Sequence, residues 1–227
     1  MIKRAVFCSF CLNTMDEIIK FFSNIGKLKG FPRRGWVIRD IKNPESIAEH
    51  TFRVAIMAWV LAVQKKYKLN LEKIIKMALI HDICEVYSGD TTPYDSILPK
   101  NKKKRQELLK TWPRFSEEEK KILAERKYKK EKDGLEKLIK DLPPKLKQEI
   151  MNLWLDYEKG LSPEGKFFRH ADRIETFLQA SEYWRDHKNF PVKPFWIQAR
   201  ELHDDPVLLE FIEQIDKEFH KNKKPKN

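Results

Sequence analysis

Residues 47–66 read IAEHTFRVAIMAWVLAVQKK, and this stretch decides the fold class. Its apolar residues recur at intervals of three and four, and in the middle of the segment they fill nearly the whole circumference of a helix. The small residues Ala48, Ala55, Ala58 and Ala62 would let neighbouring helices approach closely. The sequence therefore predicts a helix at the centre of a helical core.

Helical spacing continues on both sides of this segment. An amphipathic stripe begins at Asp16 and ends before Gly30-Phe31-Pro32, and residues 71–87 again favour a helix, which Gly89 terminates. Residues 33–47 are irregular. Start signals for later helices stand at Ser116-Glu117-Glu118-Glu119, Pro143-Pro144, Ser162-Pro163 and Asp205-Pro206. Because no stretch alternates like a strand, we expect an all-α helical bundle of about six or more helices.

The chain has 227 residues, enough for one domain or at most two. We predict a single domain over residues 15–221. Residues 1–14 form a dispensable extension in this interpretation, and both Met1 and Met15 are candidates for the natural start. Residues 100–130 are a charged insertion, and residues 222–227 form a basic, disordered tail.

Composition excludes several classes of protein. Fourteen Phe and six Trp argue against disorder, and the longest unbroken apolar run, residues 54–63, is too short to span a membrane. The formal net charge of +12 is compatible with a phosphate-bearing ligand. The basic run at residues 100–105 and the tail lack interleaved aromatic residues, so we interpret them as solvated and do not expect nucleic-acid binding. Three cysteines indicate a reducing cytoplasm rather than a disulfide framework.

Histidine is scarce, with six in the chain, and its placement is therefore informative. His81 and Asp82 are adjacent, and Glu85 follows His81 by one turn of the same predicted helix. A polar cluster on an otherwise apolar helix costs desolvation unless it is paired or bound to metal. His50 lies near the start of residues 47–66, and Asp172 lies on a later amphipathic helix. Two His and two Asp from three helices would suit a divalent transition metal with positions open for water and substrate.

Each of these residues also has a purely structural interpretation. The dipeptide His-Asp is common, and His50 could be a hydrogen-bonded core histidine. Asp172 could form an ion pair with Arg169 or Arg173. From the residues alone, both interpretations remain open.

Three segments in a fixed order carry a family resemblance: LKGFPRRGWVIRDIKNPESIAEHTFRVAIMA (28–58), ALIHDICEVYSGDTTPYD (78–95) and KFFRHADRIETFLQASEY (166–183). Together they resemble the HD-domain superfamily of metal-dependent phosphohydrolases, and within it the branch of YfbR-like 5′-deoxynucleotidases. By this resemblance His50, His81, Asp82 and Asp172 are the protein ligands of one divalent metal ion. Such a ligand set would accept Mn, Co, Fe, Ni or Zn.

The resemblance also implies roles around the metal. Glu85 corresponds to the glutamate that helps to activate the attacking water, and Asp90 to an aspartate near the sugar and that water. The RRGW segment corresponds to a loop whose arginine binds phosphate. The tryptophan of that loop helps to distinguish sugars by their 2′ position. One residue of spacing differs here, so we expect Arg34 to bind phosphate, with Arg33 as the alternative, and Trp36 to judge the sugar.

The implied activity is removal of phosphate from (2′-deoxy)nucleoside 5′-monophosphates by a metal-activated water, in the cytoplasm and by a homodimer. Within the superfamily the alternative is another nucleotide phosphoester, such as a cyclic dinucleotide, an alarmone or a deoxynucleoside triphosphate. From a different class, the alternative is a basic nucleic-acid-binding module with a structural metal. A Gly-rich phosphate loop is absent from the sequence, so ATP-driven chemistry is not indicated.

Overall fold

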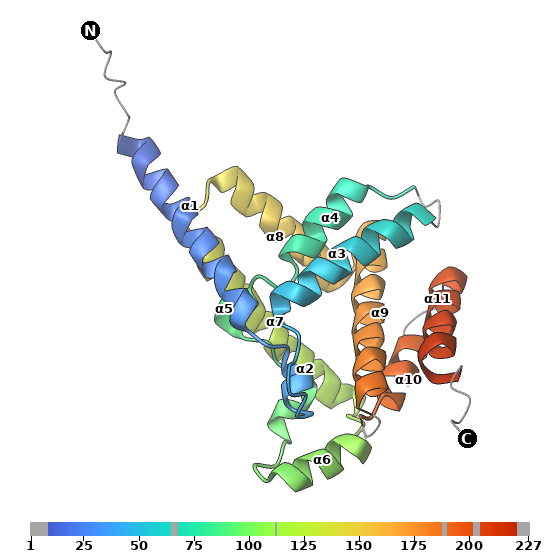
Figure 1. The fold of residues 1–227 in the computed structure, drawn as a ribbon. Coiled ribbons are helices and arrows are strands. Elements are labelled where there is room, and N and C mark those ends of the chain that lie inside the picture. Colours follow the sequence, from blue (N-terminus) through green and yellow to red (C-terminus); the bar gives the residue numbers. More distant parts are fainter. Residues whose placement is uncertain (1–8, 65–67, 112, 188–189, 202–204, 222–227) are drawn as a thin grey trace.

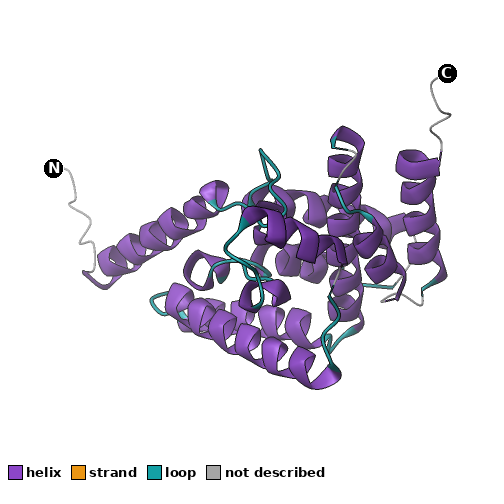
Figure 2. Ribbon diagram, turned by 90° about the horizontal axis from the view of Figure 1, so that it is seen from below, coloured by secondary structure: helices purple, strands orange, loops and turns teal. Residues whose placement is uncertain are grey.

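The structure, a computed structural model, describes residues 9–64, 68–111, 113–187, 190–201 and 205–221. Every extended regular element in this part of the chain is helical, which confirms the expected all-α fold (Figures 1 and 2). The elements are α1 (Ser9–Lys27), η1 (Leu28–Gly30), α2 (Arg34–Val37), α3 (Ile47–Gln64), α4 (Leu71–Ile80), α5 (Glu85–Ser88), η2 (Pro93–Ser96), α6 (Lys102–Thr111), α7 (Glu117–Ile139), α8 (Pro144–Lys159), α9 (Pro163–Asp186), α10 (Lys193–Glu201), α11 (Pro206–Asp216) and η3 (Lys217–Lys221).

The larger core lies where α3, α4 and α9 pack on one another, with α8 against α4 and α9. Val54, Ala58, Ile74, Phe168 and Ile174 are completely buried there. The prediction of a helix at the centre of the core holds for the buried side of α3, but the opposite side faces outward. That side, the exposed α3 face, consists of Phe52, Ile56, Trp59, Val60 and Val63, all of them exposed.

A second core joins α1, α5, α7 and α8. It holds the charged helix α7 against the turn that leads into α5. Leu135 of α7 and Trp154 of α8 are fully buried in it. At Gly134 a side chain would place its Cβ only 2.9 Å from the carbonyl oxygen of Cys84. Glycine at this position therefore allows α7 to lie directly on the turn that leads into α5.

The capping signals of the sequence are confirmed. Ser116 accepts a hydrogen bond from the backbone of Glu119, whose carboxylate accepts one from the backbone of Ser116, and α7 begins there. Ser162 caps α9 in the same manner through the backbone N–H of Gly165. Local side-chain chemistry thus fixes where both long helices start.

The single helix predicted over residues 71–87 is interrupted. α4 ends at Ile80, and the backbone then follows hydrogen bonds of the i to i+3 type, from Ile83 to Ile80 and from Glu85 to Asp82, before α5 starts. Gly89 ends α5 with a positive φ of 67°. His81 and Asp82 therefore lie in the tighter turn between α4 and α5, not inside one continuous helix.

Other boundaries also differ from the prediction. α1 begins at Ser9 rather than at Asp16, and the basic run at 100–105 enters α6 instead of a loop. The sequence did not predict α10, and the predicted tail at 222–227 lies outside the described residues. None of the described helices is long and apolar enough to cross a membrane.

Candidate active site

The ligand atoms of His50, His81 and Asp82 all lie within 4.8 Å of one another, and Asp172 adjoins this group through His50. His50 comes from the first turn of α3, His81 and Asp82 from the turn after α4, and Asp172 from α9. Nε2 of His50 lies 3.3 Å from Nε2 of His81 and 3.1 Å from an Oδ1 atom of Asp172. Oδ2 of Asp82 lies 3.1 Å from Nε2 of His81 and 3.8 Å from that of His50. Both imidazoles are buried.

Each imidazole forms a hydrogen bond through its Nδ1 atom, on the side of the ring opposite Nε2. Nδ1 of His50 lies 2.6 Å from Oε2 of Glu175, and Nδ1 of His81 lies 2.7 Å from the carbonyl oxygen of Ala78. Because both Nδ1 atoms face acceptors, both Nε2 atoms are directed at the two aspartates. A second partner of this kind is the usual way in which proteins orient a metal-binding histidine.

The charges of the cluster call for a cation at its centre. Burial and Arg33 lower the pKa of His50, but the carboxylates of Glu175 and Asp172 outweigh both effects and raise it to about 10. Although burial raises the pKa of Asp82, its contact with His81 and the charge of Arg33 hold it well below its ordinary value. The carboxylates of Glu175 and Asp172 thus favour a positive charge at His50. A bound metal ion would supply that positive charge instead. Two imidazoles and two carboxylates fit a divalent transition metal.

Glu85, the first residue of α5, lies beside this cluster. Its side chain is buried, and within the described part of the chain its Oε2 atom has no hydrogen-bond partner. Burial, followed by the charges of Asp82 and Asp90, raises the pKa of Glu85 well above its ordinary value. A carboxyl group with a raised pKa and an oxygen free of hydrogen bonds holds a proton more tightly than an ordinary carboxylate, as a group that accepts a proton from water must.

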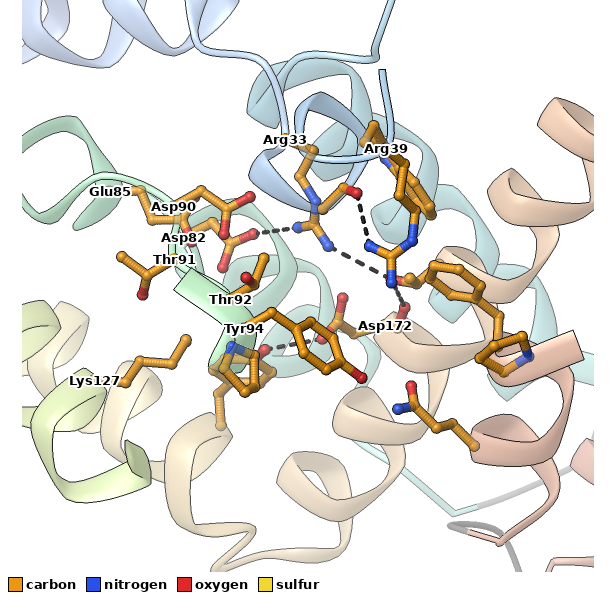
Figure 3. Close-up of a pocket in the computed structure, with 18 residues that line it drawn as sticks. Arg33, Arg39, Asp82, Glu85, Asp90, Thr91, Thr92, Tyr94, Lys127 and Asp172 are labelled. Carbon is orange, nitrogen blue, oxygen red and sulfur yellow. Dashed lines mark hydrogen bonds and ion pairs between the residues drawn. The ribbon is translucent and has the colours of Figure 1, made fainter. Parts of the chain in front are cut away.

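The two neighbouring arginines have different environments. Nη1 of Arg33 donates to Oδ2 of Asp82 at 3.0 Å, and its guanidinium points into the cavity (Figure 3). Nε of Arg34 donates to Asp95 at 2.8 Å, outside the cavity lining. The backbone N–H of Arg34 donates to Asp90 at 2.6 Å. The structure therefore places the side chain of Arg33, rather than that of Arg34, beside the cluster of His50, His81, Asp82 and Asp172.

Trp36 forms part of the cavity wall and is itself only 2% exposed. Its Nε1 donates to Glu45 at 2.8 Å, and its ring packs 5.2 Å from that of Tyr183 and 5.3 Å from that of Phe195. Phe195 lies on α10, the helix that sequence patterns did not predict. An aromatic wall thus closes part of the cavity.

The cavity beside the cluster has a volume of about 300 Å³. Sequence reasoning missed several of its lining residues, among them Arg39, Tyr94 and Lys127 (Figure 3). Lys127 forms a 2.6 Å ion pair with Glu131 and shows that the predicted insertion at 100–130 contributes to the site. Glu175 was missed as well, although its position three residues after Asp172 places both on one helix face.

A family model described as an HD domain matches residues 25–202. The chain belongs to the HD-domain family. The relatives of this HD-domain chain include the 5′-deoxynucleotidase HDDC2 of Homo sapiens, 31% identical over 91% of this chain and 88% of the relative. The 5′-deoxynucleotidase hdd1 of Schizosaccharomyces pombe is 30% identical over 74% and 73%. A solved structure of a conserved hypothetical protein from Pyrococcus furiosus is 26% identical, with a TM-score of 0.61 over 88% of this chain and 99% of that one. The resemblance to the family is confirmed.

Proposed function

We propose that this HD-domain chain is a metal-dependent phosphohydrolase that releases phosphate from nucleoside 5′-monophosphates, preferably 2′-deoxy ones. The observation that carries the proposal is the cluster of His50, His81, Asp82 and Asp172 beside the buried Glu85, whose Oε2 atom has no hydrogen-bond partner among the described residues. The cavity of about 300 Å³ suits one small ligand. Relatives that carry the name 5′-deoxynucleotidase match most of the chain and support this substrate class.

In this proposal His50, His81, Asp82 and Asp172 hold the ion, which is Mn, Co, Fe, Ni or Zn. A divalent metal bound there would polarise a phosphoryl oxygen and lower the pKa of bound water toward about 7. The ligand set alone does not select among these metals, because availability and geometry decide between ions of similar affinity.

Two residues beside the metal site take part in the reaction, Glu85 and Asp90. Glu85 accepts a proton from the water that attacks phosphorus. The bond between phosphorus and the 5′ oxygen breaks, that oxygen takes up a proton, and the products are a nucleoside and inorganic phosphate. Asp90, held by the backbone of Arg34, lies where it can orient the water or the sugar.

We assign phosphate binding to Arg33 rather than to Arg34. The guanidinium of Arg33 is next to Asp82 and can offer paired donors to phosphate oxygens, whereas the side chain of Arg34 is engaged by Asp95. Trp36 is buried in the cavity wall, and in this proposal it contacts the sugar and distinguishes its 2′ position. We place the enzyme in the cytoplasm, as the few cysteines suggest.

We further propose that the chain forms a homodimer through the exposed α3 face. Phe52 is 71% exposed and Trp59 47%, and large apolar side chains gathered on one helix face mark an interaction surface. Light scattering should give twice the chain mass for the unmodified protein and the single mass for Trp59→Lys. Leu146→Lys, at an exposed position on α8, is the control. An unchanged mass for Trp59→Lys would contradict this surface.

The function is tested on metal-stripped protein that is resupplied with one metal at a time. Release of inorganic phosphate is measured on a panel of 2′-deoxynucleoside and ribonucleoside 5′-monophosphates, a deoxynucleoside triphosphate and a cyclic dinucleotide. The proposal predicts metal-dependent phosphate release from the 5′-monophosphates, with the 2′-deoxy substrates preferred. Turnover of the triphosphate or the cyclic dinucleotide alone would contradict it.

A further inference from the structure

Arg39 follows α2 and directs its guanidinium into the cavity (Figure 3). Its Nη1 donates to the carbonyl oxygen of Gly35 at 2.8 Å. The Cζ atom lies 4.8 Å from the ring centre of Phe195 and 5.9 Å from that of Tyr94. The Nε atom is enclosed, and no residue in the described part of the chain pairs with it.

Arg39 differs from the other arginines near the site, because it has no carboxylate partner among the described residues. Arg33 pairs with Asp82, and Arg34 with Asp95. Burial lowers the pKa of Arg39 to about 10, only partly offset by Tyr94. A guanidinium that is withdrawn from water without a countercharge is costly unless a ligand supplies acceptors.

Arg39 also lies apart from the metal-ligand cluster. The carboxylates of Asp82, Asp90 and Asp172 all act on the pKa of Arg33, whereas none of them acts on that of Arg39. In Figure 3 the guanidinium of Arg33 stands between Arg39 and the carboxylates of Asp82, Asp90 and Glu85. The cavity therefore has one end with carboxylates and Arg33, where a metal ion and phosphate would bind, and another end formed by Arg39 with aromatic rings.

We propose that Arg39 binds the base of the nucleotide by donating hydrogen bonds to acceptor atoms on its edge, with Phe195 and Tyr94 offering apolar ring contacts. This inference rests on the proposed function and adds the base preference to it. Guanine presents two adjacent acceptors, O6 and N7, to a guanidinium, and thymine presents a carbonyl oxygen. Adenine sets an amino donor beside N7 and cannot accept the same pair of bonds. The enzyme should therefore prefer dGMP to dAMP.

The test compares kcat/KM for dGMP, dAMP and 2-deoxyribose 5-phosphate, which has the phosphate and the sugar but no base. Arg39→Met should lower kcat/KM for dGMP by about 10- to 100-fold, the range expected for one bidentate contact. Values for dAMP should fall less, and those for 2-deoxyribose 5-phosphate should not change. Arg39→Lys, which keeps the charge but not the paired donors, should be intermediate.

Arg200→Met is the matched control. Arg200 also stacks on an aromatic ring, that of Trp196 on α10 at 5.1 Å, but it does not line the cavity. It should leave all three substrates unaffected. An equal loss on 2-deoxyribose 5-phosphate in Arg39→Met would mean that Arg39 binds phosphate or sugar, and that result would overturn the base assignment. An unchanged preference for dGMP would overturn it as well.

Binding of 2′-deoxyguanosine, measured by titration calorimetry, separates this inference from the proposed function because it requires no turnover. Weaker binding to Arg39→Met than to Arg200→Met supports the base site even if the unmodified protein releases no phosphate from any nucleotide. Equal binding to both variants refutes the base site even if the protein proves to be a 5′-deoxynucleotidase.

Discussion

Replacing Glu175 by Gln should weaken metal binding without removing any proposed metal ligand. Glu175 is completely buried and accepts from Nδ1 of His50 at 2.6 Å and from Nε of Arg53 at 2.8 Å. Although burial raises the pKa of Glu175, His50 and Arg53 lower it below its ordinary value, so the group is an anion. A hydrogen bond to a charged group contributes about 1.5–3 kcal/mol, and a neutral one about half of that.

Glutamine keeps an acceptor oxygen for His50 but loses the charge, so the change removes roughly 1–1.5 kcal/mol, which corresponds to about tenfold in affinity. This agrees with the about 10- to 100-fold losses seen when a partner behind a ligating histidine is removed. The assay is a calorimetric titration of metal-stripped protein with Mn²⁺, supported by thermal unfolding of the metal-free variant.

Glu182→Gln is the control for this change. Glu182 accepts from Nη1 of the same Arg53 at 2.6 Å, but it does not touch His50. It should bind Mn²⁺ as tightly as the unmodified chain. If Glu175→Gln and Glu182→Gln bind Mn²⁺ equally well, then Glu175 does not position His50, and the argument from the imidazole hydrogen bonds is refuted.

Three further outcomes follow from the site. Glu85→Gln should keep bound metal and substrate affinity but lose turnover by about 10²- to 10⁴-fold, because the proton acceptor is gone; parallel loss of metal would instead make Glu85 a ligand. Arg33→Lys should lower kcat/KM on dGMP strongly and Arg34→Lys only slightly, and the reverse order would restore the original expectation for Arg34. A chain that starts at Met15 should match the full chain in melting temperature and kcat, since it keeps Ile18, Phe21 and Ile25, which pack α1 on the second core; a marked loss of either would show that residues 1–14 are needed.

The sequence predicted the parts of the fold that depend on local chemistry. A helix start depends on residues close together in the sequence, here the capping Ser116 and Ser162 and the prolines in the first turns of α8 and α9. The helices α7, α8 and α9 therefore begin where expected. The break after Ile80 has no such local marker. His81, which follows it, meets His50 of α3 and the ring of Phe168 of α9, and only the packed structure shows these partners.

The site residues also separate into those that the sequence indicates and those that only tertiary packing identifies. The family resemblance singled out His50, His81, Asp82 and Asp172, and in the structure His50 lies beside Asp172 and His81 beside Asp82. Their role as metal ligands stays a prediction. Arg33 and Arg34 are adjacent and chemically identical, so only their partners, Asp82 and Asp95, distinguish them. Arg39 carried no sequence signal, because its lack of a carboxylate partner is a property of the assembled cavity.

The central claim is that one metal ion at the cluster of His50, His81, Asp82 and Asp172 performs the hydrolysis. Asp82→Ala tests it directly when bound metal, phosphate release from a 2′-deoxynucleoside 5′-monophosphate and helical content are measured on the same preparation. The account predicts that metal and activity are lost together while the far-ultraviolet circular dichroism of the helices remains. Full metal content in Asp82→Ala, or activity that survives without metal, would contradict it.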